Sequence, residues 1–282
     1  MKQFWKKLIS ALLITLLFTP AAFATQLWLT LPATPQLPHP DTTGKVTVPG
    51  AQIWYATFGE GAPVVLLHGG LANSNYFGDL IPIIARTRKV IVIDSRGHGR
   101  SSNDGRQISY HLMAEDTLAV LDRLGVRKTA LVGWSDGGII GLDIAMNHPE
   151  RLTSLLAYGA DANYQDSLDI TNSPTFNAYL ARVPVEYQKL SPTPSQWQAF
   201  EANVFKMWSS EPTYSDSQLQ AISVKTWIAD ADHEEAIARS DTDRMFHLIP
   251  NARELILPGV SHFAFLQDPS LFAGAVIAFL QR

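Results

Sequence analysis

The stretch that decides the fold is Thr129–Asn147, which reads Thr-Ala-Leu-Val-Gly-Trp-Ser-Asp-Gly-Gly-Ile-Ile-Gly-Leu-Asp-Ile-Ala-Met-Asn. It begins with a short aliphatic run typical of a strand, and residues 138–147 have a helical pattern. Between them, Gly133 to Gly137 match the pattern G-x-S-x-G. At a strand-to-helix junction this pattern places the serine on a sharp turn, which glycine neighbours permit. The sequence therefore predicts that Ser135 is a nucleophile beside the N–H groups of a helix start.

The rest of the chain alternates in the same way between aliphatic runs and helical patterns. Runs that predict strands are residues 46–48, 53–56, 64–67, 90–93, 129–132, 152–157, 225–229 and 254–257. Residues 113–124 and 271–280 each place apolar side chains on one helical face. This alternation predicts an α/β fold, in which helices cover both faces of a mostly parallel sheet.

Composition excludes several classes of protein. The chain has 282 residues, 46% hydrophobic and 17% charged, so it can bury a core and is neither disordered nor fibrous. A net charge of -4 argues against nucleic acid as a partner. Zero cysteines exclude disulfides, a thiol nucleophile and thiolate metal sites. We expect no metal, because His233-Glu234-Glu235 lacks the second histidine of a zinc-protease motif, with Ile237 in its place. We expect no cofactor either, since residues 97–102 lack the third glycine of a dinucleotide-binding motif.

The N-terminus has the pattern of an export signal. Lys2, Lys6 and Lys7 precede a short apolar stretch, which ends near Ala22-Phe23-Ala24. Residues 1–24 are therefore expected to be a signal peptide cleaved after Ala24, and the mature protein is expected to be periplasmic or secreted without a stable membrane anchor. Residues 25–44 contain four prolines and are expected to run extended over the surface.

One segment interrupts the alternation. Residues 163–220 contain no convincing aliphatic strand and many aromatic side chains, among them Phe176, Phe200 and Trp208. We expect a mainly helical cap inserted into an α/β core made of residues 45–162 and 221–282. Its aromatic residues form either a small core of their own or the roof of a pocket.

A serine nucleophile needs a base, and His262 is the best candidate among eight histidines. It lies in the loop after the last predicted strand and comes last in the order serine, acid, histidine. The acid belongs to the cluster that follows the strand 225–229. Counted from the start of that strand, Glu234 takes the position of an orienting carboxylate, and Asp232 is the second choice.

Three other carboxylates, Asp230, Asp161 and Glu235, are weaker candidates for the acid. The oxyanion of an acyl-transfer intermediate needs N–H donors, which we assign to the backbones of Gly70 (or Leu71) and Asp136.

Together these motifs resemble those of the α/β-hydrolase superfamily over about residues 46–282. The resemblance rests on His68-Gly69-Gly70, on Asp94 to Ser101, on the G-x-S-x-G pentapeptide, on the acid cluster and on Ser261-His262-Phe263. It implies an eight-stranded sheet, a cap after the sixth strand, and a triad of Ser135, His262 and an acid. Family members usually have Gly-x-x-Asp after the seventh strand, whereas this chain has Ala231-Asp232-His233-Glu234. The extra methylene of a glutamate changes the reach of the carboxylate.

The function expected from these residues is that of an exported serine hydrolase acting on a small-molecule carboxylic ester or lactone through an acyl-enzyme. Amide or carbon–carbon bond hydrolysis would use the same triad and stays an alternative. A non-catalytic ligand-binding protein that retains the fold is another, in case Glu234 misaligns the histidine.

Overall fold

The computed structural model describes residues 26–281, so the expected signal peptide lies outside the described residues. Its centre is a single eight-stranded sheet with the strand order β1-β2-β4-β3-β5-β6-β7-β8. The strands from β3 onward run parallel, whereas β1 and β2 pair antiparallel at one edge. Their bounds are β1 Thr42–Val48, β2 Ala51–Phe58, β3 Ala62–Leu67, β4 Arg88–Ile93, β5 Thr129–Trp134, β6 Leu152–Tyr158, β7 Thr226–Ala231 and β8 Ala252–Leu257.

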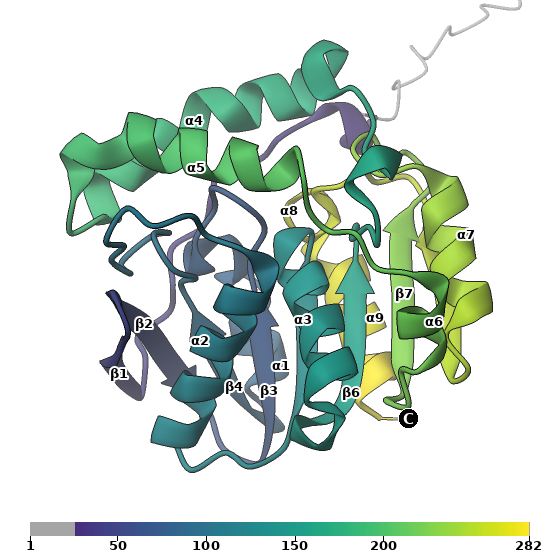
Figure 1. Cartoon of the computed structure of the whole chain (residues 1–282), viewed down its shortest axis with the longest axis horizontal. Coiled ribbons are helices and arrows are strands. Elements are labelled where there is room, and N and C mark those ends of the chain that lie inside the picture. Colours follow the sequence, from purple (N-terminus) through teal and green to yellow (C-terminus); the bar gives the residue numbers. More distant parts are fainter. Residues whose placement is uncertain (1–25, 282) are drawn as a thin grey trace, which may run out of the picture.

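Helices cover both faces of this sheet (Figure 1). In Figure 1, α2 and α3 lie in front of the sheet, and α1 and α9 lie behind it. All residues of β5 and β7 are buried, as expected for strands between two helical layers. The main helices are α1 Ile81–Ile84, α2 Tyr110–Arg123, α3 Asp136–Asn147, α4 Pro174–Leu190, α5 Trp197–Trp208, α6 Asp216–Gln220, α7 Arg239–Leu248, α8 Ala264–Gln267 and α9 Pro269–Leu280. No helix within residues 26–281 is long and apolar enough to span a membrane.

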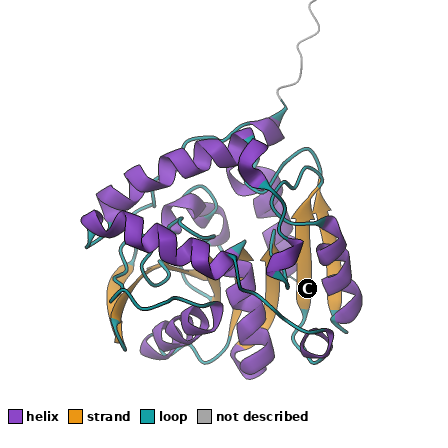
Figure 2. Ribbon diagram, turned by 45° about the horizontal axis from the view of Figure 1, so that its top comes forward, coloured by secondary structure: helices purple, strands orange, loops and turns teal. Residues whose placement is uncertain are grey.

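Helices α4 and α5 lie across the carboxyl ends of the parallel strands (Figures 1 and 2). They belong to the segment between β6 and β7, where the helical cap is expected. Their inner surface contacts loops of the sheet: the Tyr179 hydroxyl donates to the carbonyl oxygen of Gly70 at 2.5 Å, and the rings of Phe200 and His98 are 4.7 Å apart. The short helix α6 packs instead against α7, beside the sheet.

The start of β1 differs from the sequence-based boundary. We expected the proline-rich lead to extend through residue 44, but β1 begins at Thr42. Thr42, Thr43 and Gly44 pair with β2, so backbone hydrogen bonds to a neighbouring strand extend β1 through residues that carry no hydrophobic alternation.

The lead itself forms what we call the N-terminal strap, residues 30–40, which have no regular secondary structure. The guanidinium of Arg182, on α4, donates to the carbonyl oxygens of Pro32 at 2.7 Å and Leu31 at 3.0 Å. The side chain of Gln267, on α8, donates to the carbonyl oxygen of Thr30 at 2.9 Å. The strap thus links α4 to the helix that follows the His262 loop.

The predicted fold is confirmed: each aliphatic run predicted as a strand overlaps one of the eight strands, and helices flank a mostly parallel sheet.

Candidate active site

The topology gathers the chemically important loops at one edge of the sheet. Ser135 follows β5, Glu234 follows β7 and His262 follows β8, so all three lie beyond the carboxyl ends of parallel strands. The loop containing Gly70 follows β3, which is paired directly with β5. A twisted parallel sheet therefore brings together groups that are far apart in sequence.

Ser135 occupies a strained turn between β5 and α3. Its backbone angles are φ 53° and ψ -123°, a conformation that costs free energy for a residue with a side chain. The turn is crowded, because a Cβ at Gly133 would overlap the backbone of Gly137 and a Cβ at Gly137 would overlap that of Leu67. The Ser135 N–H donates to the carbonyl oxygen of Tyr158 at 2.8 Å, which ties the turn to β6. Glycine is therefore required on both sides of the serine.

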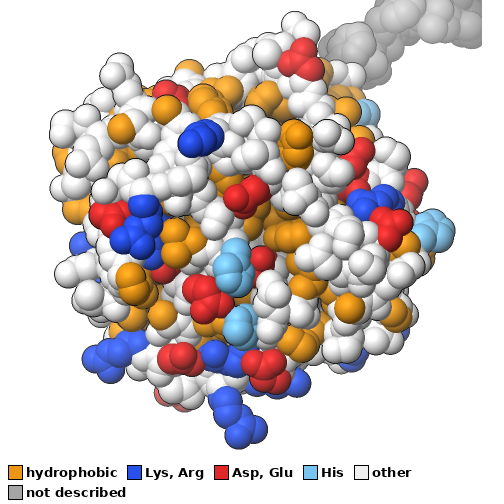
Figure 3. Space-filling model, in the orientation of Figure 1, with side chains coloured by type: hydrophobic (Ala, Val, Ile, Leu, Met, Phe, Trp, Pro, Cys, Tyr) orange, Lys and Arg blue, Asp and Glu red, His pale blue; other side chains and the backbone are white. Residues whose placement is uncertain are grey.

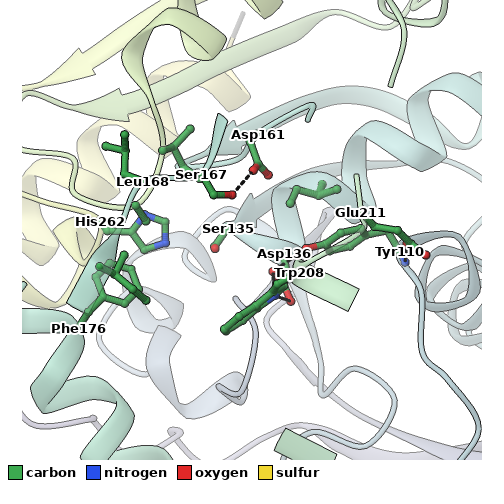
Figure 4. Close-up of a pocket in the computed structure, with 14 residues that line it drawn as sticks. Tyr110, Ser135, Asp136, Asp161, Ser167, Leu168, Phe176, Trp208, Glu211 and His262 are labelled. Atoms are coloured by element: carbon green, nitrogen blue, oxygen red, sulfur yellow. Dashed lines mark hydrogen bonds between the residues drawn. The ribbon is translucent and has the colours of Figure 1, made fainter. Parts of the chain in front are cut away.

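His262 is held from both its backbone and its ring. Nδ1 of the ring lies 2.8 Å from Oε1 of Glu234, and both side chains are nearly excluded from solvent. The same Oε1 accepts the backbone N–H of Ala236 at 2.8 Å. The N–H of His262 donates to Glu235 at 3.2 Å. With Nδ1 engaged by Glu234, Nε2 is the ring nitrogen left to face the cavity, and Figure 4 shows the imidazole and the side chain of Ser135 pointing toward each other.

The remaining carboxylates of the acid cluster have other contacts. Asp232 accepts the N–H of Gly259 at 2.8 and 2.9 Å and is exposed, away from the His262 ring. Asp230 accepts the hydroxyl of Thr242 at 2.9 Å. Of the two acids preferred from the sequence, Glu234 is therefore the one that the fold brings into contact with His262.

Burial controls the protonation of this pair. It lowers the pKa of His262 to about 4, so the imidazole is neutral at physiological pH and able to accept a proton. Burial also raises the pKa of Glu234 to about 7, and the nearby charge of Glu235 acts in the same direction, whereas hydrogen bonds from Asp230 and Ala236 lower it.

The candidate oxyanion donors lie next to Ser135. A Cβ built on Gly69 would be 3.1 Å from the Cβ of Ser135, so the loop after β3 passes directly beside the serine. A Cβ on Gly70 would be 2.5 Å from Oδ2 of Asp136 and would also overlap the ring of Trp208. Only glycine fits there, which keeps the backbone of the loop close to the start of α3.

The side chain of Asp136 has contacts that the sequence did not indicate. Its carboxylate accepts the Tyr110 hydroxyl at 3.1 Å and the indole N–H of Trp208 at 2.9 and 3.1 Å. Burial raises its pKa to about 6, and the two donors act in the opposite direction. Asp136 thus contributes a buried carboxylate to the site as well as its backbone.

A cavity of ≈ 200 Å³ opens at these residues (Figure 4). Apolar side chains form much of its wall, and no lysine or arginine lines it. The lining residues are Tyr110, Ser135, Asp136, Ile139, Asp161, Ser167, Leu168, Ile170, Phe176, Trp208, Glu211, Ala236, Ile237 and His262.

Several residues that line the cavity were not predicted from the sequence. Phe176 and Trp208 belong to the expected aromatic roof, whereas Phe200 packs against Tyr187, outside the cavity lining. Tyr110 and Glu211 carry no motif, and only the path of the chain brings them here. Asp161 was considered only as a candidate acid for His262, but it lines the cavity and accepts the hydroxyl of Ser167 at 2.8 Å.

Elsewhere the described chain offers few alternative sites. Residues 26–281 contain no group of three or more histidine, aspartate or glutamate side chains placed to hold a metal ion. On the face shown in Figure 3, acidic and basic side chains are interspersed rather than gathered into an area of one sign.

Several proteins that this chain resembles are hydrolases. A model of the family described as "alpha/beta hydrolase fold" matches residues 62–195. The chain is 23% identical over 273 residues to 2-hydroxy-6-oxo-6-(2'-aminophenyl)hexa-2,4-dienoic acid hydrolase of Metapseudomonas resinovorans, covering 84% of this chain and 90% of that protein.

Two solved structures have a similar fold. Est816, described as an N-acyl homoserine lactone degrading enzyme, superposes with a TM-score of 0.68 at 25% identity, over 84% of this chain and 100% of that one. The serine hydrolase CarC, involved in carbazole degradation, superposes with a TM-score of 0.73 at 21% identity, over 85% of this chain and 98% of that one.

The eight-stranded sheet, the serine turn and these matches define a hydrolase. The chain belongs to the α/β-hydrolase superfamily.

Proposed function

We propose that this hydrolase cleaves small carboxylic esters or lactones through a triad of Ser135, His262 and Glu234. The observation that carries the proposal is the contact of Glu234 with Nδ1 of His262 at 2.8 Å, beside the cavity that His262 and Ser135 both line. A serine hydroxyl needs a base, and an imidazole base needs a partner that fixes its tautomer and stabilises its charged form.

In the proposed reaction, the Ser135 hydroxyl oxygen attacks the acyl carbonyl carbon while Nε2 of His262 accepts the hydroxyl proton. The N–H groups of Gly70 and Asp136 donate to the resulting oxyanion. Collapse of the intermediate breaks the bond to the alcohol oxygen, which takes the proton from His262. Water then gives a proton to His262 and attacks the acyl-enzyme, and the acid product leaves as the serine recovers its proton. Glu234 stabilises the imidazolium in both halves of the cycle.

The substrate preference rests on the size of the cavity and its apolar wall. A volume of ≈ 200 Å³ is smaller than pockets that enclose drug-sized ligands, so short acyl groups fit best. The likeness to Est816 supports including lactones among the candidates.

Carbon–carbon or amide bond hydrolysis by the same three residues is the second candidate. The match to a dienoic acid hydrolase over 84% of the chain favours testing such acids. Their carboxylate has no lysine or arginine to bind among the residues that line this cavity, which is why we rank esters first.

We also propose that the protein acts outside the cytoplasm. The support is the sequence of residues 1–24, with its basic start, apolar stretch and Ala22-Phe23-Ala24. Cells that express the full chain should contain a protein that begins at Thr25 in the periplasmic or external fraction. A full-length protein confined to the cytoplasm would refute export.

Covalent labelling tests the nucleophile directly. A fluorophosphonate probe should label the wild-type protein, and Ser135→Ala should abolish both labelling and hydrolysis of p-nitrophenyl acetate. Ser217→Ala, on the exposed helix α6, is the control that should behave as wild type. A folded wild-type protein that neither reacts with the probe nor hydrolyses any ester would favour the ligand-binding alternative.

A further inference from the structure

The two sides of the cavity carry different kinds of side chain. In Figure 4, His262, Phe176 and Leu168 lie on one side of Ser135, whereas Asp161, Glu211 and Tyr110 lie on the other. Three carboxyl groups, those of Asp136, Asp161 and Glu211, line this small cavity, and no lysine or arginine lines it.

Two of these carboxyl groups already have partners. Asp136 accepts hydrogen bonds from Tyr110 and Trp208 through its carboxylate. Glu211 is half-buried and accepts the backbone N–H of Tyr110 at 3.1 Å.

One carboxylate oxygen of Asp161 accepts no hydrogen bond from another residue of the described chain. Its side chain is almost fully buried, with 3% of the residue exposed, yet it lines the cavity. Oδ2 accepts the Ser167 hydroxyl, and no other residue of the described chain donates to Oδ1. Because Asp161 lines the cavity, a hydrogen-bond donor on a bound ligand can reach Oδ1 and add a hydrogen bond to a charged group.

The electrostatics of the cavity also favour a donor of positive charge. The pKa of Asp161 is raised to about 7, chiefly by burial and in part by the carboxylates of Asp241 and Asp136, against the lowering effect of the Ser167 hydroxyl. A cationic group would relieve this crowding of negative charge, whereas an anionic one would add to it. The ring of Trp208 in the same wall also favours a cation.

The proposed reaction determines on which side of Ser135 the acyl chain of the substrate lies. In the proposed mechanism His262 returns its proton to the leaving alcohol, so the alcohol lies on the His262 side of Ser135. The acyl chain then extends to the opposite side, where Asp161 and Glu211 lie.

We infer that the preferred substrates are esters whose acyl chain carries an ammonium group, and that Asp161 and Glu211 are specificity-determining residues that bind it. The inference rests on the proposed hydrolase function and names the substrate class of that site.

Methyl esters of equal shape and different charge test it at pH 8. The cationic member is methyl 3-(dimethylamino)propanoate, the neutral member is methyl 4-methylpentanoate and the anionic member is monomethyl succinate. We expect kcat/KM for the cationic ester to exceed that of the neutral one by about tenfold to a hundredfold, the range of a hydrogen bond to a charged group. The anionic ester should be the poorest substrate.

Variants assign the preference to the two carboxylates. Asp161→Asn and Glu211→Gln should each lower the cationic-to-neutral ratio of kcat/KM severalfold, and the ratio cancels any effect that the two esters share. Circular dichroism and labelling of Ser135 by the fluorophosphonate probe show that each variant is folded and keeps its nucleophile. Asp169→Asn is the matched control, because Asp169 is exposed, lies outside the cavity lining and caps Thr171 through an oxygen that asparagine retains.

Each part of the proposal would be overturned by a different experimental result. If no ester is hydrolysed and the probe does not label Ser135, the proposed function itself is wrong. If the neutral ester is hydrolysed but the wild type prefers neutral or anionic acyl chains, the ammonium inference is overturned. A cationic preference that survives in both variants would overturn the assignment to Asp161 and Glu211. A preference seen only when the ammonium is on the alcohol, as in 2-(dimethylamino)ethyl acetate against 3-methylbutyl acetate, would overturn the acyl-side placement.

Discussion

Replacing Glu234 by glutamine removes the negative charge behind His262 and keeps the shape of the side chain. Oε1 of Glu234 accepts both the His262 ring at 2.8 Å and the backbone N–H of Ala236 at 2.8 Å. Since that backbone N–H requires an acceptor, the amide oxygen of glutamine should take the Oε1 position. The imidazole then keeps its tautomer, and the variant loses only the charge that stabilises the imidazolium.

The size of the loss follows from burial. The side chains of Glu234 and His262 are 3% and 2% exposed, so water cannot replace the missing charge. A buried charge left without its partner costs about 3–5 kcal/mol. With tenfold in rate for each 1.36 kcal/mol, kcat for p-nitrophenyl acetate should fall by roughly 10² to 10⁴, and KM should change little.

The control is Asp232→Asn. Asp232 is exposed and accepts only the N–H of Gly259 in this loop, a bond that asparagine can keep. Its kcat should stay within about twofold of wild type, the usual range for a surface substitution. A severe loss in Asp232→Asn together with near-normal activity in Glu234→Gln would refute the assignment of the acid.

The pH profile gives an independent readout of the same group. Burial raises the pKa of Glu234 to about 7, so the carboxylate is charged above this value and neutral below it. In the wild type, kcat/KM should therefore fall as the pH drops through about 7. Glu234→Gln should lack this fall, and an unchanged acidic limb in the variant would contradict the reasoning.

Three further predictions concern the oxyanion loop, the strap and the buried acids. Gly70→Ala would place a Cβ against Asp136 and Trp208 and displace the loop. The kcat for p-nitrophenyl acetate should then fall by about 10² to 10³, as for the loss of one oxyanion donor. An unchanged kcat would contradict the assignment of this loop to the oxyanion site. Arg182→Met removes three hydrogen bonds from α4 to the N-terminal strap, so the free energy of unfolding in a urea titration should fall by about 1–3 kcal/mol. Unchanged stability would show that the contacts of Arg182 with the strap add nothing. Thermal unfolding should show a lower melting temperature at pH 8.5 than at pH 6.5. Folding raises the pKa values of four buried carboxyl groups, so the folded state binds more protons in this range than the unfolded state. The opposite trend would refute the shifts assigned to Asp136, Asp161, Asp230 and Glu234.

Two buried histidines, His98 and His262, oppose this dependence of stability on pH, mainly at lower pH. Burial lowers the pKa of His262 to about 4 and that of His98 to about 3, so the folded state resists their protonation. In the unfolded state these histidines take up protons as the pH falls through 6.5, the lower end of the test, so most of the resulting loss of stability lies below the range of the test.

Local patterns in the sequence were enough for the sheet and for the serine turn. Aliphatic runs identify strands buried on both faces, and the crowding around Ser135 permits only glycine at Gly133 and Gly137, so both features are legible in short stretches of chain. The positions of Ser135 and His262 after parallel strands likewise place both loops at one edge of the sheet, with β6 and β7 between β5 and β8.

Which carboxylate touches His262, and what the cavity would bind, depended on tertiary structure. Glu234 and Asp232 are two residues apart, and only the path of the loop after β7 buries one against the imidazole and exposes the other. Asp161 and Glu211 are separated by the whole of α4 and α5. Hydrogen bonding and charge interactions act over a few ångströms in space, so the chemistry of this cavity exists only once the chain has brought these side chains together.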